Sequence, residues 1–426
     1  MNTPPRRPAV ALDCLGCKLN QAEIQQLARS LEDAGYVIVD SIEKADIYIL
    51  NTCSVTSTAD SKSRQLLRQA RRLNPAARLI AAGCYAQRAP EDLKAIEGVE
   101  LVLGNNKKMS LPSLLGYISA PETPDSPATR WQEKRRRRSF LKIQEGCRNF
   151  CAYCIVPFVR NKETSQPAEK ILALVKGLSA QGYREIVLTG TEIGAYNSNG
   201  IDLEQLIRRI IGETAAPRIR ISSLQPHQVT PGLAELWKNP RLCPHFHLSL
   251  QSGSDTVLKR MKRKYTAADY LRAVEMLRAN IPDVAITTDV IAGFPGETDA
   301  EFKETVEFCR KIKFARIHIF PFSSRPGTEA ASMTGQVPDA VKKARTAEML
   351  ALAGESAREF RQSFTGRELD VLWEQQSAGV WSGYTPNYIK VYAKSGEELT
   401  NRIAPVKLVK LYRDGMWGEI SSAITD

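Results

Sequence analysis

The sequence predicts an α/β protein built from a parallel α/β domain, an open partial barrel of six βα units and a small antiparallel β-barrel. Apolar strand-like runs alternate with helical patterns through most of the chain, which is typical of parallel sheets. From about residue 366, short strands separated by turns replace this alternation. A stretch rich in Pro, Ser and Thr, residues 119–130, interrupts it once. We therefore expect an N-terminal domain at 1–118, a linker at 119–135, the barrel at 136–364 and a C-terminal domain at 365–426.

Length and composition narrow the class of protein. A chain of 426 residues needs more than one core, and its 43% hydrophobic and 25% charged residues are those of a soluble globular protein. No apolar run is long enough to span a bilayer, and the N-terminus lacks the apolar core of a secretory signal. We expect a cytoplasmic protein with no membrane partner. Its nine cysteines should then be reduced, and clustered cysteines in that setting bind metal or do redox chemistry.

The charge of the chain is strongly positive. A net charge of +12, from 59 Lys and Arg against 47 Asp and Glu, fits a polyanionic partner such as RNA. Five consecutive cations, Lys134 to Arg138, directly precede the barrel. A contact with RNA phosphates and an ordinary solvated face are equally open interpretations of this run.

The first two parts of the chain share the βα alternation. In the N-terminal domain, strands are predicted at 9–12, 47–50 and 78–82, and Ile24, Leu27, Ala28 and Leu31 define one apolar face of a helix that stops at Gly35. The barrel strands are predicted at 140–143, 185–188, 218–221, 245–250, 284–291 and 316–321, with helices such as 168–178, 203–211 and 301–312 between them. Barrels of this kind carry their chemistry at the C-terminal ends of the strands.

The third part is predicted to be a small antiparallel β-barrel of the kind that often binds oligonucleotides. Its strands are predicted at 368–373, 388–391, 406–411 and 415–420, with turns at Ser382-Gly383 and Asp414-Gly415. Several aromatic and basic residues of this part could stack bases or hold phosphates. Each of them is individually typical of ordinary surface or core. They are Tyr384, Tyr388, Lys390, Lys407, Lys410 and Arg413.

Cys147, Cys151 and Cys154 form a CxxxCxxC motif after the first barrel strand. Three thiolates at this spacing suit an iron–sulfur cube, and a cube held by three thiolates leaves one iron open for a cofactor or substrate. The alternative is a zinc site made by Cys151, Cys154 and a distant histidine. The position at the mouth of a barrel favours the cluster.

Three further cysteines occupy equivalent positions in the N-terminal domain. Cys17, Cys53 and Cys84 each follow a strand and precede a helix. In a parallel sheet such turns meet at one edge, so these thiols can hold a second cluster with an open iron. The alternative is three incidental buried cysteines.

These motifs resemble those of the methylthiotransferase family within the radical S-adenosylmethionine (SAM) superfamily. The resemblance covers nearly the whole chain: an N-terminal domain, the radical SAM barrel and a C-terminal RNA-binding TRAM domain. The segments GCKLNQAE, NTCSVT and GCYAQR are most similar to the branch that acts on N6-threonylcarbamoyladenosine at position 37 of tRNA. The resemblance implies two [4Fe–4S] clusters, on Cys147, Cys151 and Cys154 and on Cys17, Cys53 and Cys84. Cys14 is extra, and is expected to be a core residue at a strand end.

The resemblance also implies a reaction. A SAM-derived 5′-deoxyadenosyl radical would abstract hydrogen from C2 of the adenine, and the N-terminal cluster would hold the sulfur that a second SAM methylates. The expected partners are the tRNA anticodon stem-loop, an electron donor such as flavodoxin or ferredoxin, and a sulfur source. The alternatives are the branches that act on isopentenyladenosine-37 or on a ribosomal protein, and a non-catalytic RNA-binding protein with structural zinc.

Some residues outside the cysteine motifs are candidates for SAM contacts. Gln251 and Asp289 are candidates because they lie at the end of strand four and within strand five, and Asp289 could instead serve only to bind its neighbours. Tyr153 could pack near the adenine of SAM or only in the core, and Glu192 could bind SAM or cap a helix. Gly190 would let the backbone approach the cofactor. The resemblance places these last three at the SAM site.

Three residues near the last barrel strands have more ordinary interpretations. Thr298 and Glu301 form a capping box, which is purely structural. His318 is expected to be a satisfied residue of the barrel core. Arg325 is expected to reach a substrate phosphate.

Overall fold

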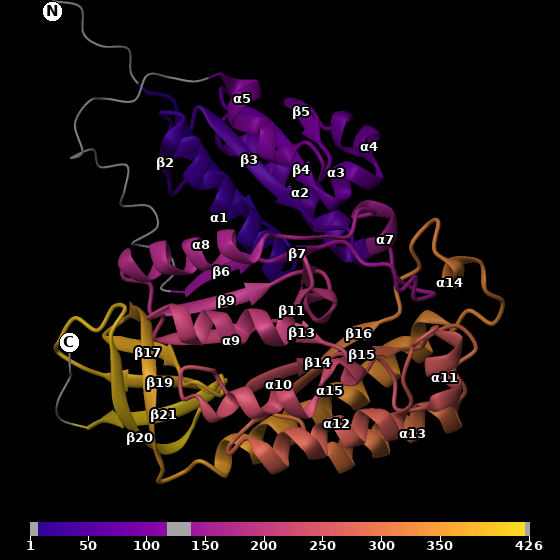
Figure 1. Cartoon of the computed structure of the whole chain (residues 1–426). Coiled ribbons are helices and arrows are strands. Elements are labelled where there is room, and N and C mark those ends of the chain that lie inside the picture. The colour runs from indigo at the N-terminus through magenta and orange to yellow at the C-terminus, as the bar shows by residue number, and fades with distance from the viewer. Residues whose placement is uncertain (1–6, 117–137, 422–426) are drawn as a thin grey trace, which may run out of the picture.

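The computed structural model describes residues 7–116 and 138–421, and in it three parts follow one another along the chain (Figure 1). The predicted linker at 119–135 lies outside the described residues, as do Lys134 to Arg137 of the basic run. Within the described ranges, no helix has both the length and the apolar character needed to cross a membrane.

The N-terminal part is a fully parallel five-stranded sheet of order β2-β1-β3-β4-β5 with helices on both faces. The three predicted strands are present. Two short ones, β2 and β5, were not predicted. The elements are β1 (Ala9–Cys14), α1 (Lys18–Asp33), β2 (Val37–Val39), β3 (Ile47–Thr52), α2 (Ser57–Leu73), β4 (Arg78–Gly83), α3 (Cys84–Arg88), α4 (Pro90–Lys94), β5 (Val99–Leu103) and α5 (Leu111–Leu115). The predicted apolar face of α1 is buried under the sheet.

The central part is the predicted open barrel. All six predicted strands are present, together with the short β13, in two parallel sheets of order β12-β9-β6 and β13-β14-β15-β16. Strands β6 and β16 are edges, so the barrel does not close. Its strands are β6 (Arg138–Lys142), β9 (Glu185–Thr189), β12 (Arg218–Ile221), β13 (Ser223–Leu224), β14 (His245–Leu248), β15 (Ala285–Ala292) and β16 (Arg316–Pro321). Its outer helices are α8 (Ala168–Ala180), α9 (Leu203–Glu213), α10 (Pro231–Glu235), α11 (Asp255–Arg260), α12 (Ala267–Asn280), α13 (Asp299–Ile312), α14 (Glu329–Ser332) and α15 (Asp339–Gln362).

Short elements lie in the loops that follow β6 and β9: β7 (Gln144–Glu145), α7 (Val156–Val159), β8 (Thr164–Ser165), β10 (Asn197–Ser198) and β11 (Ile201–Asp202). The capping box predicted at the start of α13 is present, with Thr298 as its N-cap and Glu301 as its third residue.

Helix α1 lies against the inner face of the barrel at its open side. Ala22 of α1 packs with Phe140 of β6 and Val187 of β9. The neighbouring Leu141 and Ile186 point the other way, into the core beneath the outer helices. The N-terminal part therefore covers inner strand faces that an open barrel would otherwise leave exposed.

The C-terminal part is a closed five-stranded barrel of order β17-β18-β19-β21-β20. Its strands are β17 (Glu368–Ser377), β18 (Val380–Tyr384), β19 (Lys390–Lys394), β20 (Ile403–Tyr412) and β21 (Gly415–Ile420). Neighbouring strands are antiparallel except for β19 and β21, which pair in parallel. The turn predicted at Ser382-Gly383 is wrong, since both residues lie inside β18. A Cβ atom at Gly383 would meet Val371 and the Leu372 carbonyl, so the glycine serves close strand packing.

Candidate active site

The three N-terminal cysteines meet at one edge of the sheet. Cys17 precedes α1, Cys53 follows β3 and Cys84 begins α3, at the carboxyl ends of three neighbouring strands. The turn before Cys17 lies directly against Cys53. A Cβ atom added at Gly16, whose φ is +102°, would lie 2.8 Å from the Cys53 Sγ. Cys14 packs instead against the hydrophobic core under the sheet.

Loss of hydration raises the pKa of two of these thiols, Cys53 and Cys17. It raises the pKa of Cys53 to about 12, and the nearby thiols of Cys17 and Cys84 act in the same direction. The side chain of Cys17 is exposed at this edge, and partial loss of hydration still raises its pKa against the opposing charge of Arg160. Such thiols stay protonated at neutral pH until a metal displaces the proton.

The second trio lies in the loop between β7 and α7. Burial raises the pKa of both Cys147 and Cys154 to about 12. Phe150 takes a left-handed conformation inside this loop, with φ of 46°, and its ring is 57% exposed. The loop thus places its thiols inward and an aromatic side chain outward.

Side-chain N–H groups donate to sulfur atoms in both trios. Asn149 Nδ2 donates to Cys147 Sγ at 3.3 Å, Arg263 Nη1 to Cys151 Sγ at 3.2 Å and Asn105 Nδ2 to Cys84 Sγ at 3.5 Å. Donors of this kind stabilise thiolate charge and tune clusters. Within the described residues, no three His, Cys, Asp or Glu side chains converge as a single metal ion requires. Three thiols in each trio, with N–H donors beside several of them, are the donor set of a cube held by three thiolates.

The two cysteine trios are joined by a shared hydrophobic cluster, which forms a wall between them. Cys84 packs with Ile155 and Val159, which follow Cys154 by one and five residues. Asn105 Nδ2 bridges the same contact by also donating to the Val159 carbonyl at 2.9 Å. Cysteines that lie up to 137 positions apart along the chain are therefore brought next to one another.

Glu192 points at the cysteine loop and makes no side-chain cap to the short helix that follows it. Its Oε2 accepts a hydrogen bond from Cys147 Sγ at 3.1 Å, and its Oε1 accepts from Gln228 Nε2 at 2.7 Å and from Gln225. The helix-cap interpretation of Glu192 is therefore wrong.

Arg263 is a site residue that the sequence did not reveal. Besides Cys151, it donates to Tyr265 at 2.9 Å and to Gln225 Oε1 at 3.2 Å. Tyr153, which lies 3.4 Å from the same guanidinium, also packs against the small hydrophobic core that contains Phe294 and Phe322. In the sequence Arg263 sits in the run KRK, which looks like an ordinary charged surface.

Gly190 and Gln251 have special backbone environments. A Cβ atom at Gly190 would lie 2.8 Å from the Gln144 carbonyl oxygen, so the glycine is needed for the packing of Gln144 whatever else binds there. Gln251 is held at a φ of 69°, which is strained for a residue with a side chain, and its N–H donates to the Asp289 carbonyl.

Asp289 belongs to a polar group inside the barrel. Its Oδ2 lies 3.1 Å from His247 Nε2, and the His247 and His318 rings are 5.9 Å apart. Burial alone would raise the pKa of Asp289, but the hydrogen bond from His247 and the charges of His247, His318 and Lys18 hold it below its usual value. Burial lowers the pKa of His318 to about 4. His318 is thus one member of a polar cluster and not an isolated core histidine.

The C-terminal barrel completes the base of this interior. Arg138 Nη1 donates to the Tyr388 hydroxyl at 2.7 Å and Arg138 pairs with Glu374, while Arg220 lies over the Tyr388 ring at 4.5 Å and pairs with Glu185. Burial would raise the pKa of Tyr388, but these two arginines and Lys18 lower it. Tyr388 therefore faces the central barrel and not a free RNA-binding surface. The exposed members of the predicted basic set are Lys407, Lys410 and Arg413.

A buried ionic cluster joins the N-terminal part to the cysteine loop. Glu23 of α1 accepts from Arg160 at 2.7 and 2.8 Å, lies 3.3 Å from Lys142, and also pairs with Lys108. Burial alone would raise the pKa of Glu23, but Lys108 and Arg160 hold it well below its usual range. The ionised form of Glu23 is therefore strongly favoured.

Arg325 does not reach toward a substrate phosphate. Its side chain is 3% exposed and pairs with Asp60 of α2, and its Nη2 donates to Ser54 at 3.0 Å. The predicted phosphate contact is wrong, because Arg325 is a buried link between the two domains.

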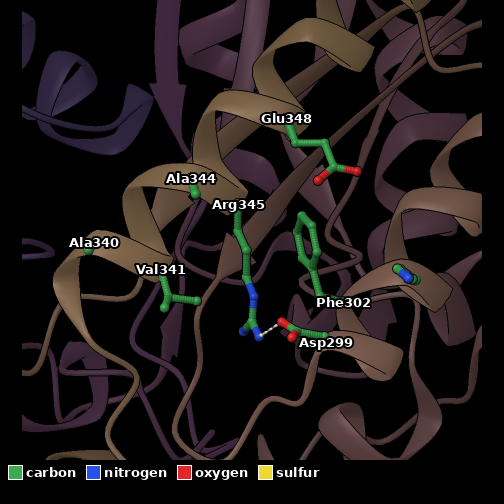
Figure 2. Close-up of a pocket in the computed structure, with 8 residues that line it drawn as sticks. Asp299, Phe302, Ala340, Val341, Ala344, Arg345 and Glu348 are labelled. Atoms are coloured by element: carbon green, nitrogen blue, oxygen red, sulfur yellow. Dashed lines mark hydrogen bonds and ion pairs between the residues drawn. The ribbon is translucent and has the colours of Figure 1, made fainter.

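A groove of about 480 Å³ opens between α13 and α15 on the outside of the barrel (Figure 2). Asp299 accepts a hydrogen bond from Arg345 across it at 2.8 Å. None of the cysteines or predicted SAM contacts lines this groove. Its lining residues are Asp299, Phe302, Lys303, Ala340, Val341, Ala344, Arg345 and Glu348.

An open βα barrel with three thiols at its mouth, next to a domain that carries three more, defines a radical SAM enzyme with an added N-terminal domain. The Radical SAM superfamily matches residues 141–309, and the uncharacterized protein family UPF0004 matches residues 9–104. A threonylcarbamoyladenosine tRNA methylthiotransferase of Bacillus subtilis is 38% identical, with 96% of each chain covered. A tRNA-2-methylthio-N(6)-dimethylallyladenosine synthase of Moorella thermoacetica is 35% identical, over 93% of this chain and 94% of the relative.

The chain belongs to the radical SAM methylthiotransferase family. Among solved structures, a radical SAM methyltransferase of Kitasatospora setae shares the fold, with a TM-score of 0.56, 14% identity and 88% of this chain covered against 81% of the other. As a radical SAM enzyme the chain uses SAM and an iron–sulfur cluster. The alternative of a non-catalytic protein with structural zinc is rejected.

Proposed function

We propose that this enzyme adds a methylthio group to C2 of N6-threonylcarbamoyladenosine at position 37 of tRNA. The observation that carries the proposal is the wall shared by the two thiol trios, with Cys84 packed against Ile155 and Val159. Radical generation and sulfur transfer must both reach a single adenine, so the two centres must be neighbours. The relative of Bacillus subtilis is named for this substrate.

Each trio has a separate task in the proposal. Cys147, Cys151 and Cys154 hold one [4Fe–4S] cluster, and Cys17, Cys53 and Cys84 hold the other. When bound, the first cluster with SAM supplies the 5′-deoxyadenosyl radical and the second supplies the sulfur. SAM itself is bound by Tyr153, Gly190, Glu192, Gln251 and Asp289.

Glu192 is suited to hold the ammonium group of SAM. In the thiol form, Cys147 donates to the Glu192 carboxylate at 3.1 Å. A thiolate that binds iron has no proton to donate, and two anions at this distance repel each other. A cation beside Glu192 relieves the repulsion, and the ammonium of SAM is a cation of the right kind.

Exposed aromatic and basic side chains would bind the anticodon stem-loop. Phe150 and Phe158 are 57% and 51% exposed beside the cysteine loop, where they could stack unpaired bases. Lys407, Lys410 and Arg413 of the C-terminal barrel would hold phosphates. The proposal divides the chain as 1–118, 119–135, 136–364 and 365–426, with the last segment as the TRAM domain, in an enzyme that works in the cytoplasm.

Nucleoside mass spectrometry of tRNA from a deletion strain tests the substrate. The methylthio derivative of threonylcarbamoyladenosine should disappear and return when the wild-type gene is restored, but not with a Cys84→Ala gene. Loss of the isopentenyladenosine derivative instead, or of a methylthio group on a ribosomal protein, would assign the enzyme to another branch. Purified enzyme also needs an added reductant and a sulfur source, and flavodoxin or ferredoxin is the proposed electron donor.

A further inference from the structure

Lys18 places a positive charge inside the barrel. It is the residue after Cys17, at the start of α1, the helix that covers the inner face of β6 and β9. Its Nζ lies 5.9 Å from the centre of the Tyr388 ring. The Tyr388 ring in turn lies 4.8 Å from the ring of His245 on β14, the strand that also carries His247 beside Asp289. Lys18 therefore reaches from the N-terminal cysteine edge into the polar interior described above.

The positive charges around Lys18 are only partly neutralised. Arg138 pairs with Glu374 and Arg220 with Glu185, at 2.6 and 2.8 Å. Arg218 donates to the backbone carbonyls of Asp370 and Tyr384. In residues 7–116 and 138–421, no carboxylate lies within ion-pair distance of the Lys18 ammonium, and Asp289 is engaged by His247 instead. A part-buried ammonium without an anion favours an anionic ligand.

We propose that Lys18 binds the carboxylate of the threonylcarbamoyl group and so selects that substrate. The inference rests on the proposed function, because it concerns the same adenine. The threonylcarbamoyl group carries a carboxylate and a hydroxyl, and Lys18 and His318 offer one cation and one hydrogen-bonding side chain to match them. An isopentenyl group would leave the Lys18 ammonium without an anion in the interior, which is how polar sites reject apolar analogues.

The test compares an acid with its neutral ester. Anticodon stem-loops that carry threonylcarbamoyladenosine or its methyl ester are titrated into SAM-loaded holoenzyme without reductant, so that binding is measured and no turnover occurs. Wild-type protein should bind the acid roughly 100-fold more tightly than the ester, as expected when one partner of a buried charge pair is lost. Lys18→Met should bind both equally, Lys18→Arg should recover most of the preference, and Lys44→Met, an exposed lysine, should behave as wild type.

Further readouts separate this role from others. Lys18→Met should keep the iron content of wild type and cleave SAM at the wild-type rate when reductant is added without tRNA. A fall in SAM cleavage would mean that Lys18 binds the carboxylate of SAM, which overturns the proposal. Full preference for the acid in Lys18→Met would also overturn it. If wild-type protein methylthiolates another nucleoside, the proposed function itself is wrong.

Discussion

Arg160 and Glu23 form a bidentate ion pair across the boundary between the N-terminal domain and the segment that follows the cysteine loop. Arg160 Nη1 lies 2.7 Å from Glu23 Oε1 and Nη2 lies 2.8 Å from Oε2, with the side chains 3% and 1% exposed. Glu23 follows Cys17 by six residues and Arg160 follows Cys154 by six residues. The pair therefore joins the helix that follows Cys17 to the segment that follows Cys154.

Arg160→Met should destabilise the protein strongly. It leaves Glu23 with fewer cations in a buried site, which typically costs about 3–5 kcal/mol of unfolding free energy. Denaturant unfolding of the apoprotein measures the change. Arg209→Met, which removes exposed ion pairs with Glu169 and Glu213, is the control and should cost less than about 1 kcal/mol. Equal losses in the two variants would contradict a structural role for Arg160.

Iron analysis should divide the six cysteines into two sets. The triple variant Cys147→Ala, Cys151→Ala, Cys154→Ala should keep about half of the wild-type iron, and so should the triple variant of Cys17, Cys53 and Cys84. Each variant should retain a distinct electron paramagnetic resonance signal. Cys14→Ala should keep all of the iron, because Cys14 packs in the core. Loss of iron in Cys14→Ala with retention in Cys17→Ala would move the ligand to Cys14.

Gly16→Ala should lose the N-terminal cluster. The new Cβ would lie 2.8 Å from the Cβ and Sγ atoms of Cys53, and φ of +102° strains any side chain. Gly182→Ala is the matched control, because it has φ of +84° but no atom within 4 Å. Both should lose about 1 kcal/mol from backbone strain, and only Gly16→Ala should lose iron. An iron content unchanged in Gly16→Ala would show that the turn tolerates displacement of Cys53.

Glu32 should make stability depend on pH. Burial raises its pKa to about 7 from an ordinary value of 4.5, with a contribution from Asp33. The stabilisation is fully present below pH 4.5 and is lost as pH rises through 7, because the folded protein must then ionise a part-buried group. Glu32→Gln should therefore be more stable than wild type at pH 8, by on the order of 1 kcal/mol, and the two should converge near pH 4.5. Thermal unfolding across this range measures the difference.

Lys410→Ala and Arg413→Ala should each weaken the binding of tRNA to a similar extent, whatever the nucleotide sequence of the tRNA. Each should also reduce the slope of log affinity against log salt by about 1, as expected for a phosphate contact. Lys44→Ala is the control on the N-terminal part. A slope unchanged in both variants would remove the C-terminal barrel from the RNA interface.

The meeting of Cys17, Cys53 and Cys84 was predictable because it needs only local patterns: each strand, its turn and the helix that follows. The contacts of Lys18 with Tyr388, of Arg160 with Glu23 and of Arg263 with Gln225 were not predictable, because these partners lie about 40 to 370 residues apart and no periodicity marks them. Arg325 was misjudged for the same reason.

Strand β18 shows a different limit of prediction from the sequence. Ser382-Gly383 has the composition of a turn, yet the glycine is needed where two strands approach closely. Local propensity and tertiary packing favoured opposite answers there, and packing decided the structure.

The C-terminal barrel supplies hydrogen-bond acceptors to arginines on the first strands of the catalytic barrel. Arg138 binds Glu374, Arg218 donates to the Asp370 carbonyl at 3.1 Å and Arg220 to the Pro386 carbonyl at 2.9 Å. A protease cut that released the C-terminal barrel would remove Glu374 and Tyr388 from Arg138 and two backbone acceptors from Arg218, and would leave Arg220 with Glu185 alone. The C-terminal barrel is therefore built into the end of the central barrel, and a shortened chain that lacks it would expose buried arginines as well as lose an RNA-binding domain.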